Sequence, residues 1–132
     1  MILLASSGVK QRRHHRDIEH QIQCSCVQWF RLQYPKYRHN LFAVPNGGRR
    51  DETTAGKLKA EGVLAGVADL ILLKRNDHYG ALLIEMKTRS GHQAESQKQW
   101  QSLIERDGYK YVICRSLEDF QREVNTYLST SQ

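Results

Sequence analysis

Two acidic residues and one lysine lie in two short, largely apolar runs near the middle of the chain. Asp69 belongs to the run GVADLILL over residues 66–73, and Glu85 and Lys87 end the run ALLIEMK over residues 81–87. Apolar runs of this length, bounded by polar residues and glycine, predict buried β-strands. The polar segment over residues 74–80 ends in glycine and predicts a hairpin connection between the two strands.

A turn centred on Asp77 would pair residues whose numbers sum to 154, and Asp69 and Glu85 satisfy that sum. Opposed residues of an antiparallel pair have Cβ atoms about 4.5–5.5 Å apart, so two like charges there destabilise the sheet. Such a pair beside apolar residues needs a compensating cation. Lys87 shares the face of Glu85 because side chains alternate along a strand. The pattern predicts a divalent-metal site with an adjacent lysine, suited to phosphodiester chemistry; a turn centred elsewhere would move the acids apart.

The expected ion is Mg²⁺ or Mn²⁺, because a hard divalent cation on oxygen ligands can activate a water and neutralise charge on phosphate oxygens. Asp69 and Glu85 would be its ligands, and the backbone carbonyl of Met86 is a plausible third because it lies between Glu85 and Lys87. Lys87 would orient or help to deprotonate the water, or stabilise developing charge. The alternative is structural, with Asp69 at a turn and Glu85 and Lys87 forming a surface ion pair.

The charge balance favours a polyanionic partner. The chain has 132 residues, which predicts one domain, and a formal charge of +6 at neutral pH. The isoelectric point near 9.4 makes nucleic acid the simplest such partner. No stretch reaches membrane-spanning length and no signal peptide is recognised, so we expect no membrane partner and a cytoplasmic location. Cys24, Cys26 and Cys114 lie in apolar runs and are predicted to be core residues in a reducing compartment.

The first helix is predicted over residues 17–33, where apolar residues recur on one broad stripe. Glu19 falls within that stripe. Its carboxylate either reaches solvent at the edge of the stripe or is directed across the sheet at the metal site, and the helical wheel does not decide between them. Residues 1–16 form a basic lead-in that is expected to be solvated, with nucleic-acid contact as the alternative.

A loop rich in glycine and arginine follows a short strand over residues 40–44. Paired glycines leave backbone N–H groups free to approach a phosphate, and arginine forks match phosphate oxygens. By itself such a loop is equally an ordinary exposed turn. Two lysines on a predicted helix over residues 51–60 add charge nearby. The candidate nucleic-acid contacts are therefore Asn46, Gly47, Arg49, Arg50, Lys57 and Lys59.

The last third of the chain predicts a helix over residues 93–106, a strand over 110–114 and a helix capped by Ser116. Gln97 lies on the apolar face of the first of these helices. It either satisfies a local backbone group or faces a wet cavity, because a buried amide must find partners. A hairpin followed by a helical crossover to a further strand predicts an α/β fold with a mixed sheet and helices on both faces.

Asp69 followed by Glu85-Met86-Lys87 resembles the PD-(D/E)xK nuclease signature, with Ala68 in place of its proline. The segments over residues 44–49, 60–63, 66–69 and 97–100 resemble the VRR-NUC family (virus-type replication-repair nucleases) in particular. The ordered set of motifs is more specific than the acidic signature alone. The resemblance covers roughly residues 17–115 and places the nuclease domain at residues 17–132.

This resemblance implies a restriction-endonuclease-like core with about four strands in αβββαβ order, flanked by helices. It implies Mg²⁺- or Mn²⁺-dependent cleavage of DNA, often branched DNA such as a Holliday junction or flap. It also assigns active-site roles to Glu19 and Gln97. Short members of bacterial and phage type resemble dimeric enzymes, so a homodimer is expected, in a bacterial or phage-infected cell. A non-catalytic DNA-binding module that keeps the nuclease fold is the alternative.

Overall fold

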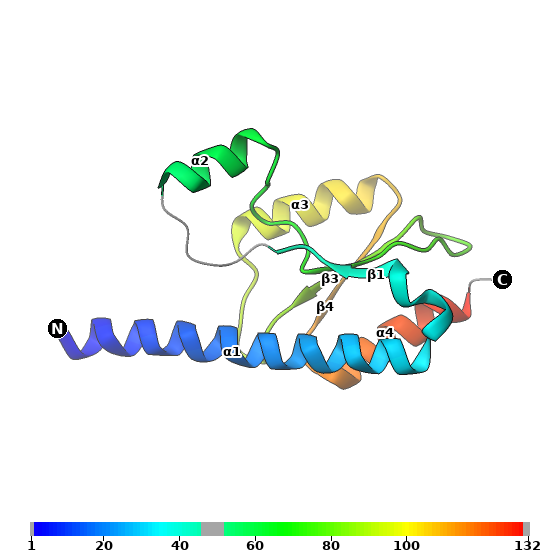
Figure 1. Cartoon of the computed structure of the whole chain (residues 1–132), viewed down its shortest axis with the longest axis horizontal. Helices are drawn as coiled ribbons and strands as arrows, with labels where there is room; N and C mark the ends of the chain where they lie inside the picture. The colour runs from blue at the N-terminus through cyan, green and yellow to red at the C-terminus, as the bar shows by residue number, and fades with distance from the viewer. Residues whose placement is uncertain (1, 46–51, 131–132) are drawn as a thin grey trace.

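The computed structural model describes residues 2–45 and 52–130, with side chains from residue 10 onward except those of residues 11, 52 and 53. Figure 1 shows the order of the elements along the chain. The four α-helices are α1 (Ile2–Gln33), α2 (Glu52–Ala60), α3 (Glu95–Arg106) and α4 (Leu117–Ser129). A 3₁₀-helix, η1 (Pro35–Asn40), follows α1. The strands are β1 (Leu41–Ala43), β2 (Leu70–Leu72), β3 (Leu82–Met86) and β4 (Lys110–Cys114).

The four strands form one mixed sheet in the order β1-β2-β3-β4. β1, β2 and β3 pair antiparallel, and β4 pairs parallel to β3. Leu70 is opposite Ile84 and Leu72 is opposite Leu82, so the predicted register with a sum of 154 is confirmed. The Asp69 N–H donates at 3.0 Å to the carbonyl of Ile84, the residue already paired with Leu70, so the pairing departs from this register by one residue at Asp69. The predicted mixed α/β fold is confirmed.

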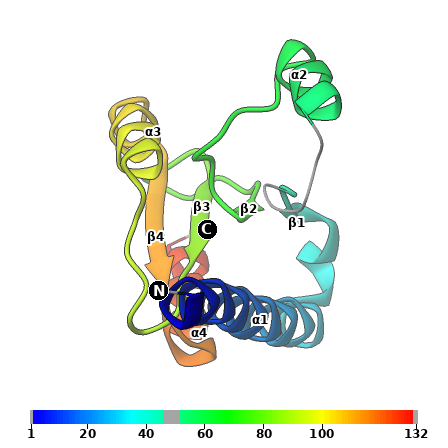
Figure 2. The ribbon, with the colours of Figure 1, turned by 90° about the vertical axis from the view of Figure 1, so that its left-hand side faces the viewer.

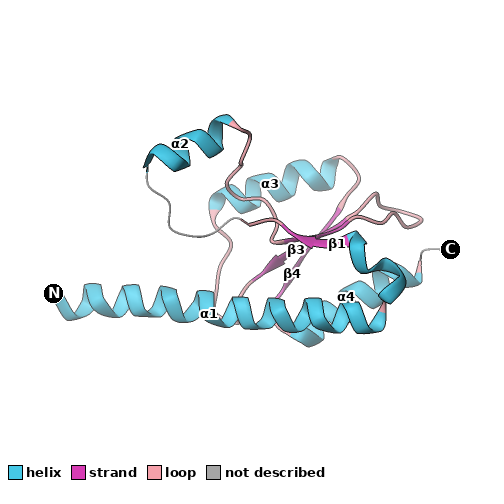
Figure 3. Ribbon diagram, in the orientation of Figure 1, coloured by secondary structure: helices cyan, strands magenta, loops and turns pink. Residues whose placement is uncertain are grey.

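Helices cover both faces of the sheet, and each face has its own core. Leu82, Ile84 and Met86 of β3 pack with α1 and α4, including Phe30 and Phe120. The opposite face carries a smaller core in which Leu83 and Tyr111 pack against Trp100 and Ile104 of α3, together with Ala68 and Ala81. In Figure 2, α1 and α4 lie together at the bottom and α3 lies at the top, with the strands between them. Figure 3 shows that long loops connect α2 and α3 to the sheet.

The first helix is longer than predicted, because α1 begins at Ile2 and not near Asp17. The apolar stripe that marks a packed helix starts only at Ile18, and the residues before it, which include Ser6, Ser7 and Gly8, carry no stripe or propensity that would predict a helix. The periodic pattern therefore located the packed part of the helix and not its start. The division into a lead-in over residues 1–16 and a nuclease domain over 17–132 does not coincide with a helix boundary, and it stays a prediction.

Two of the three cysteines are buried as predicted. Burial raises the pKa of Cys26 and of Cys114 to about 12, so both thiols stay protonated at neutral pH. The prediction for Cys24 is wrong, because this side chain is exposed. Cys24 precedes Cys26 by two residues, about 200° around the helix, and so cannot share its face.

In the described part of the chain, no helix combines the length and apolar character that a bilayer span requires.

Candidate active site

The hairpin register brings Asp69 and Glu85 together at one end of the sheet. Asp69 directly precedes β2, Glu85 is the fourth residue of β3, and Lys87 directly follows β3. The Met86 N–H donates to Oδ2 of Asp69 at 2.7 Å. The Lys87 N–H instead donates to the Cys114 carbonyl of β4 at 3.0 Å. The backbone of β3 thus turns its Met86 peptide edge toward Asp69, as the alternation of strand hydrogen bonds requires.

Glu85 is fully buried, and its two carboxylate oxygens have different surroundings. Oε1 accepts hydrogen bonds from the Tyr111 hydroxyl and from Nε2 of Gln93, the latter at 3.0 Å. Oε2 has no hydrogen-bond partner among the described residues. The nearest cation is the Lys87 ammonium, with Nζ 3.9 Å from Oε2 and only 14% of the side chain exposed. A buried carboxylate oxygen without a hydrogen-bond donor is costly, and a cation bound beside it would offset that cost.

Asp69 is also largely removed from solvent. Burial raises its pKa above the ordinary value, and the neighbouring charge of Glu85 adds to this rise. The hydrogen bond from the Met86 N–H and the charge of Lys87 act in the opposite direction. When both are ionised, the two carboxylates carry more negative charge than the one neighbouring lysine neutralises in this partly buried site.

α1 brings a third carboxylate, Glu19, into the same electrostatic environment. Burial raises the pKa of Glu19, while the charge of Lys87 lowers it and that of Asp69 raises it. A hydrogen bond from the Thr88 backbone N–H also favours the ionised form. Glu19 is half-buried, and the charges of both Lys87 and Asp69 act on its carboxylate. This is the arrangement expected of a carboxylate directed at the site. Its role in the reaction stays a prediction.

Tyr111 and Gln93 are site residues that sequence reasoning missed. Tyr111 lies on β4, where it pairs with Leu83 in a parallel register and shares the face of Glu85. Gln93 lies in the connection before α3 and also donates to Oε1 of Gln101 at 2.8 Å. A tyrosine among the apolar residues of a predicted strand was the available signal, because a buried hydroxyl needs a partner. Gln93 sits in a loop and carried no periodic signal.

Gln97 satisfies a local backbone group, the first of the two alternatives for this residue. Its Oε1 accepts the hydrogen bond of the Ala94 N–H at 2.7 Å, at the start of α3. This bond satisfies one of the free N–H groups at the helix N-terminus. No contact of Gln97 with Asp69 or Glu85 is found in the described structure. Its predicted active-site role is therefore untested.

The turn that follows Lys87 is held by Arg115. The Arg115 guanidinium donates to the carbonyls of Thr88 and Gly91 at 2.7 Å each and to that of Arg89 at 3.3 Å. Thr88 is itself buried, and its hydroxyl lies 3.1 Å from Nδ1 of His15 on α1. Lys87 is thus anchored to β4 on one side and to a fixed turn on the other.

The predicted nucleic-acid contacts divide into two groups. Lys57 and Lys59 lie in the last turn of α2, are exposed, and stand apart from the sheet (Figure 1). Asn46, Gly47, Arg49 and Arg50 lie outside the described residues. All six contacts remain predictions.

The donor set fits a hard divalent ion. Asp69, Glu85 and the Met86 carbonyl would all bind a metal through oxygen, and the buried Oε2 of Glu85 accepts no hydrogen bond from the residues that the structure describes. Among the residues that the structure describes, no group of three or more His, Cys, Asp and Glu side chains converges as a metal cage. Mg²⁺ commonly takes one or two carboxylates and keeps several waters, so two carboxylates and a carbonyl suffice.

A mixed sheet that holds an Asp and a Glu-x-Lys strand between helices is the core of a nuclease-type domain. The chain belongs to the VRR-NUC domain family, whose sequence model matches residues 8–118. A solved structure described as a VRR_NUC domain protein shares the fold with a TM-score of 0.76 and 23% identity. That similarity covers 86% of this chain and 90% of the other. The comparison with curated proteins finds no significant match.

Proposed function

We propose that this chain is a divalent-metal-dependent DNA endonuclease that hydrolyses phosphodiester bonds. The observation that carries the proposal is the environment of Glu85. Its Oε1 is held by Tyr111 and Gln93, while the buried Oε2 has no donor among the described residues and faces the Lys87 ammonium at 3.9 Å. A structural ion pair would not require a fully buried carboxylate with one oxygen left unsatisfied.

The proposed roles follow from the surroundings of each residue. Asp69, Glu85 and the Met86 carbonyl would hold Mg²⁺ or Mn²⁺. When bound, such an ion supplies an activated water and neutralises charge on the phosphate oxygens. Lys87, fixed by its bond to Cys114 and by the turn after it, would place its ammonium against the reacting phosphate.

Two further residues have proposed roles at the same site. Glu19 has a raised pKa and would exchange a proton next to Lys87. Gln97 would act through its place at the N-terminus of α3, where it orders the first turn. The predicted phosphate contacts Lys57, Lys59, Arg49 and Arg50, with Asn46 and Gly47, would serve the same substrate.

The second candidate function is a DNA-binding module that keeps the fold without cleavage. Against it stands the cost of the site, because a binding module gains nothing from burying Glu85 with an unsatisfied oxygen. Metal dependence separates the two, since a binding module holds DNA without Mg²⁺ and releases no product.

The test is cleavage of a substrate panel with Mg²⁺, comprising flap, splayed-arm, four-way junction and linear duplex DNA. We expect the branched substrates to be cut in preference to the linear duplex. Glu85→Gln and Lys87→Met should abolish cleavage while circular dichroism shows a folded protein. Undiminished cleavage by either purified variant would overturn the assignment, and cutting of all substrates alike would remove the selectivity for branched DNA.

Metal binding and assembly are tested separately. Mn²⁺ titration by calorimetry should show binding that is lost in Asp69→Ala. The family resemblance suggests a homodimer, which sedimentation velocity can test directly: a monomer at all concentrations would exclude it. A bacterial or phage-infected cytoplasm is the proposed setting.

A further inference from the structure

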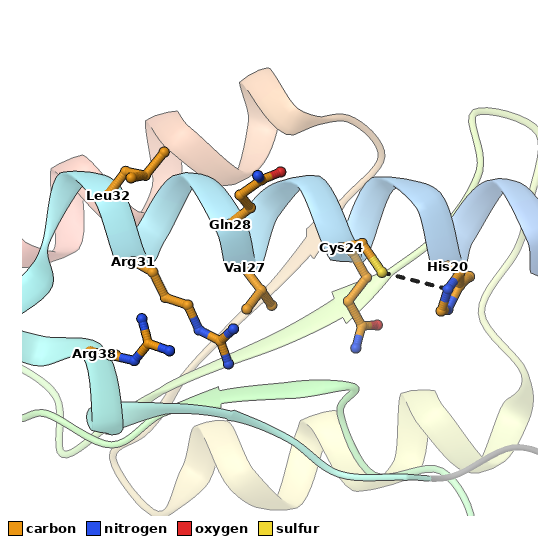
Figure 4. A pocket seen from close by; sticks show the side chains of 8 residues that line it. His20, Cys24, Val27, Gln28, Arg31, Leu32 and Arg38 are labelled. Atoms are coloured by element: carbon orange, nitrogen blue, oxygen red, sulfur yellow. Dashed lines mark hydrogen bonds between the residues drawn. The ribbon is translucent and has the colours of Figure 1, made fainter.

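A hollow of about 590 Å³ lies beside α1 and is separate from the residues that surround Glu85. His20, Gln23, Val27, Gln28 and Arg31 line it from α1, and Arg38 closes it from η1. Figure 4 shows Arg31 and Arg38 extending from these two elements with their guanidinium groups at the same end of the hollow. The hollow thus has one strongly cationic end.

The other end of this hollow begins next to the candidate active site. Gln23 lies one helical turn beyond Glu19, and Val27 and Arg31 follow at further steps of four residues. Arg31 is twelve residues from Glu19, so it lies about 18 Å farther along the axis of α1. That distance equals about five nucleotides of a strand that keeps the axial rise of double-stranded DNA, about 3.4 Å per nucleotide. A strand held at the active site could therefore reach the two arginines without a change in the protein.

The charges in the hollow are arranged for an anion. None of the described residues that line it is acidic. In the part of the chain that the structure describes, neither Arg31 nor Arg38 forms an ion pair. Two guanidinium groups brought together without a carboxylate repel each other, and a phosphate bound between them would remove that cost. Gln23 and Gln28 add amide donors that suit the sugar-phosphate backbone and carry no charge.

We propose that this hollow binds the sugar-phosphate backbone of a DNA strand that leaves the active site, with Arg31 and Arg38 holding a phosphate about five nucleotides from the scissile bond. The inference rests on the proposed function for the identity of the substrate. It adds a second, remote contact that would position the strand and leave the chemistry to Glu85 and Lys87.

The first test is DNA binding in EDTA, so that cleavage plays no part. The probe is a fluorescein-labelled splayed-arm duplex, measured by anisotropy over a series of salt concentrations. Arg31→Ala and Arg38→Ala should each weaken binding about fivefold to tenfold and reduce the slope of log affinity against log salt by about 1. The matched control is Arg106→Ala, which removes the same charge from the last turn of α3 on the opposite face of the sheet.

The second test shortens the arms of the same duplex to about two nucleotides, too short to span the distance from Glu19 to Arg31. The short probe should bind the wild type and Arg31→Ala equally. If Arg31→Ala loses the same affinity for the long-arm and short-arm probes, or loses none for either, the inference is overturned. It is also overturned if the wild type binds none of the DNA substrates. Dissociation of a dimer by Arg31→Ala would also overturn it, because the hollow would then be an interface between two copies.

The two proposals fail in different ways. If the arginine effects hold but no substrate is cut with Mg²⁺, the catalytic proposal fails and the strand-binding hollow stands. If the Glu85 and Lys87 variants lose cleavage but Arg31→Ala and Arg38→Ala cleave like the wild type, the endonuclease proposal stands and the hollow does not bind the strand.

Discussion

Tyr111 and Glu85 are joined across the parallel strands β3 and β4, with the tyrosine hydroxyl donating to Oε1 of the buried carboxylate. Gln93 donates to the same oxygen at 3.0 Å. Burial and the contact with Glu85 raise the pKa of Tyr111, so its hydroxyl stays protonated and remains a donor. Because both donors use Oε1, the carboxylate has a fixed orientation that leaves Oε2 on the side of Lys87.

Tyr111→Phe should therefore loosen Glu85 without removing any proposed metal ligand. We expect Mn²⁺ affinity to fall about tenfold to a hundredfold, which is typical when a partner that orients a metal ligand is lost. The free energy of unfolding should fall by about 1 kcal/mol because one buried hydrogen bond is lost. Calorimetry and urea denaturation measure the two effects. The control is Tyr109→Phe, whose side chain is 38% exposed; equal Mn²⁺ affinity of Tyr111→Phe and the wild type would contradict the orienting role.

Asp69→Asn should stabilise the metal-free protein at neutral pH and abolish divalent-ion binding. The folded protein raises the pKa of Asp69 above its ordinary value of about 3.9, chiefly through burial. The folded state then binds this proton more tightly than the unfolded chain does. The proton bound to Asp69 therefore contributes fully to the stability of the fold below about pH 3.9, and this contribution is lost as the pH rises through the raised pKa. An uncharged asparagine can still accept from Met86, so the gain at neutral pH should be about 1 kcal/mol.

Denaturation of the metal-free protein across the acidic range measures this effect, with Asp17→Asn as the control because Asp17 is an exposed acid of α1. The wild type should lose stability relative to Asp69→Asn as the pH rises above about 4. Added Mn²⁺ should then restore the wild type and leave the variant unchanged. A variant that is less stable than the wild type at neutral pH would show that the ionised Asp69 supports the fold.

The antiparallel part of the site was predictable because local features determine it. A polar turn centred on Asp77 sets the register, and one-residue slips are excluded because they would turn Leu70 and Leu72 away from the core. Counting along that register brings Asp69 and Glu85 to the same end of the hairpin, although the Asp69 N–H bonds Ile84 and so departs from the register by one residue. The stripe of α1 likewise showed that Glu19 occupies a position normally reserved for an apolar side chain.

The partners of these acids were not predictable in the same way. Tyr111 reaches Glu85 only because β4 returns beside β3 after the α3 crossover, and no turn sets the register of such a parallel pair. Gln97 shows a different limit: the wheel placed it on the apolar face of α3, but a helix cap and a wet cavity satisfy an amide equally well. The start of α1 at Ile2 was not predictable because the residues before Ile18 carry neither a packing stripe nor a consistent helix propensity.

Arg115 should influence turnover through the turn after Lys87. Its guanidinium bonds the carbonyls of Thr88, Arg89 and Gly91, and Arg115→Met removes all three bonds. We expect a loss of about 1–2 kcal/mol in the free energy of unfolding. The kcat of DNA cleavage should fall about tenfold or more with little change in KM, because Lys87 would be misplaced while the DNA-binding surface is intact.

Arg115→Lys separates charge from geometry, since it keeps the cation but lacks the planar fork. It should resemble Arg115→Met. Arg122→Met is the control for this region: its side chain is 64% exposed, and its ion pairs are with Asp119 and Glu123 of its own helix. Full activity of the lysine variant would mean that the positive charge alone is what the turn requires.

Gly66 and Gly62 form a matched pair for testing how closely α3 packs against the segment that leads into β2. Both have positive φ, 91° and 103°, so alanine is strained at either position. A Cβ at Gly62 would meet none of the described residues within 4 Å, whereas one at Gly66 would lie 2.7 Å from the Ser96 backbone oxygen in the first turn of α3. Gly62→Ala should therefore cost about 1 kcal/mol from backbone strain alone.

Gly66→Ala should cost about 3 kcal/mol or more, because the collision is with helix backbone and cannot be relieved by a side-chain rotation. Asp69 follows Gly66 by only three residues, so displacement here should also shift that carboxylate and weaken Mn²⁺ binding. Gly62→Ala should leave Mn²⁺ binding unchanged. Urea denaturation gives the two stability losses and calorimetry the affinities. Equal losses for both variants would mean that α3 moves away at little cost, and that its contact with Gly66 does not position Asp69.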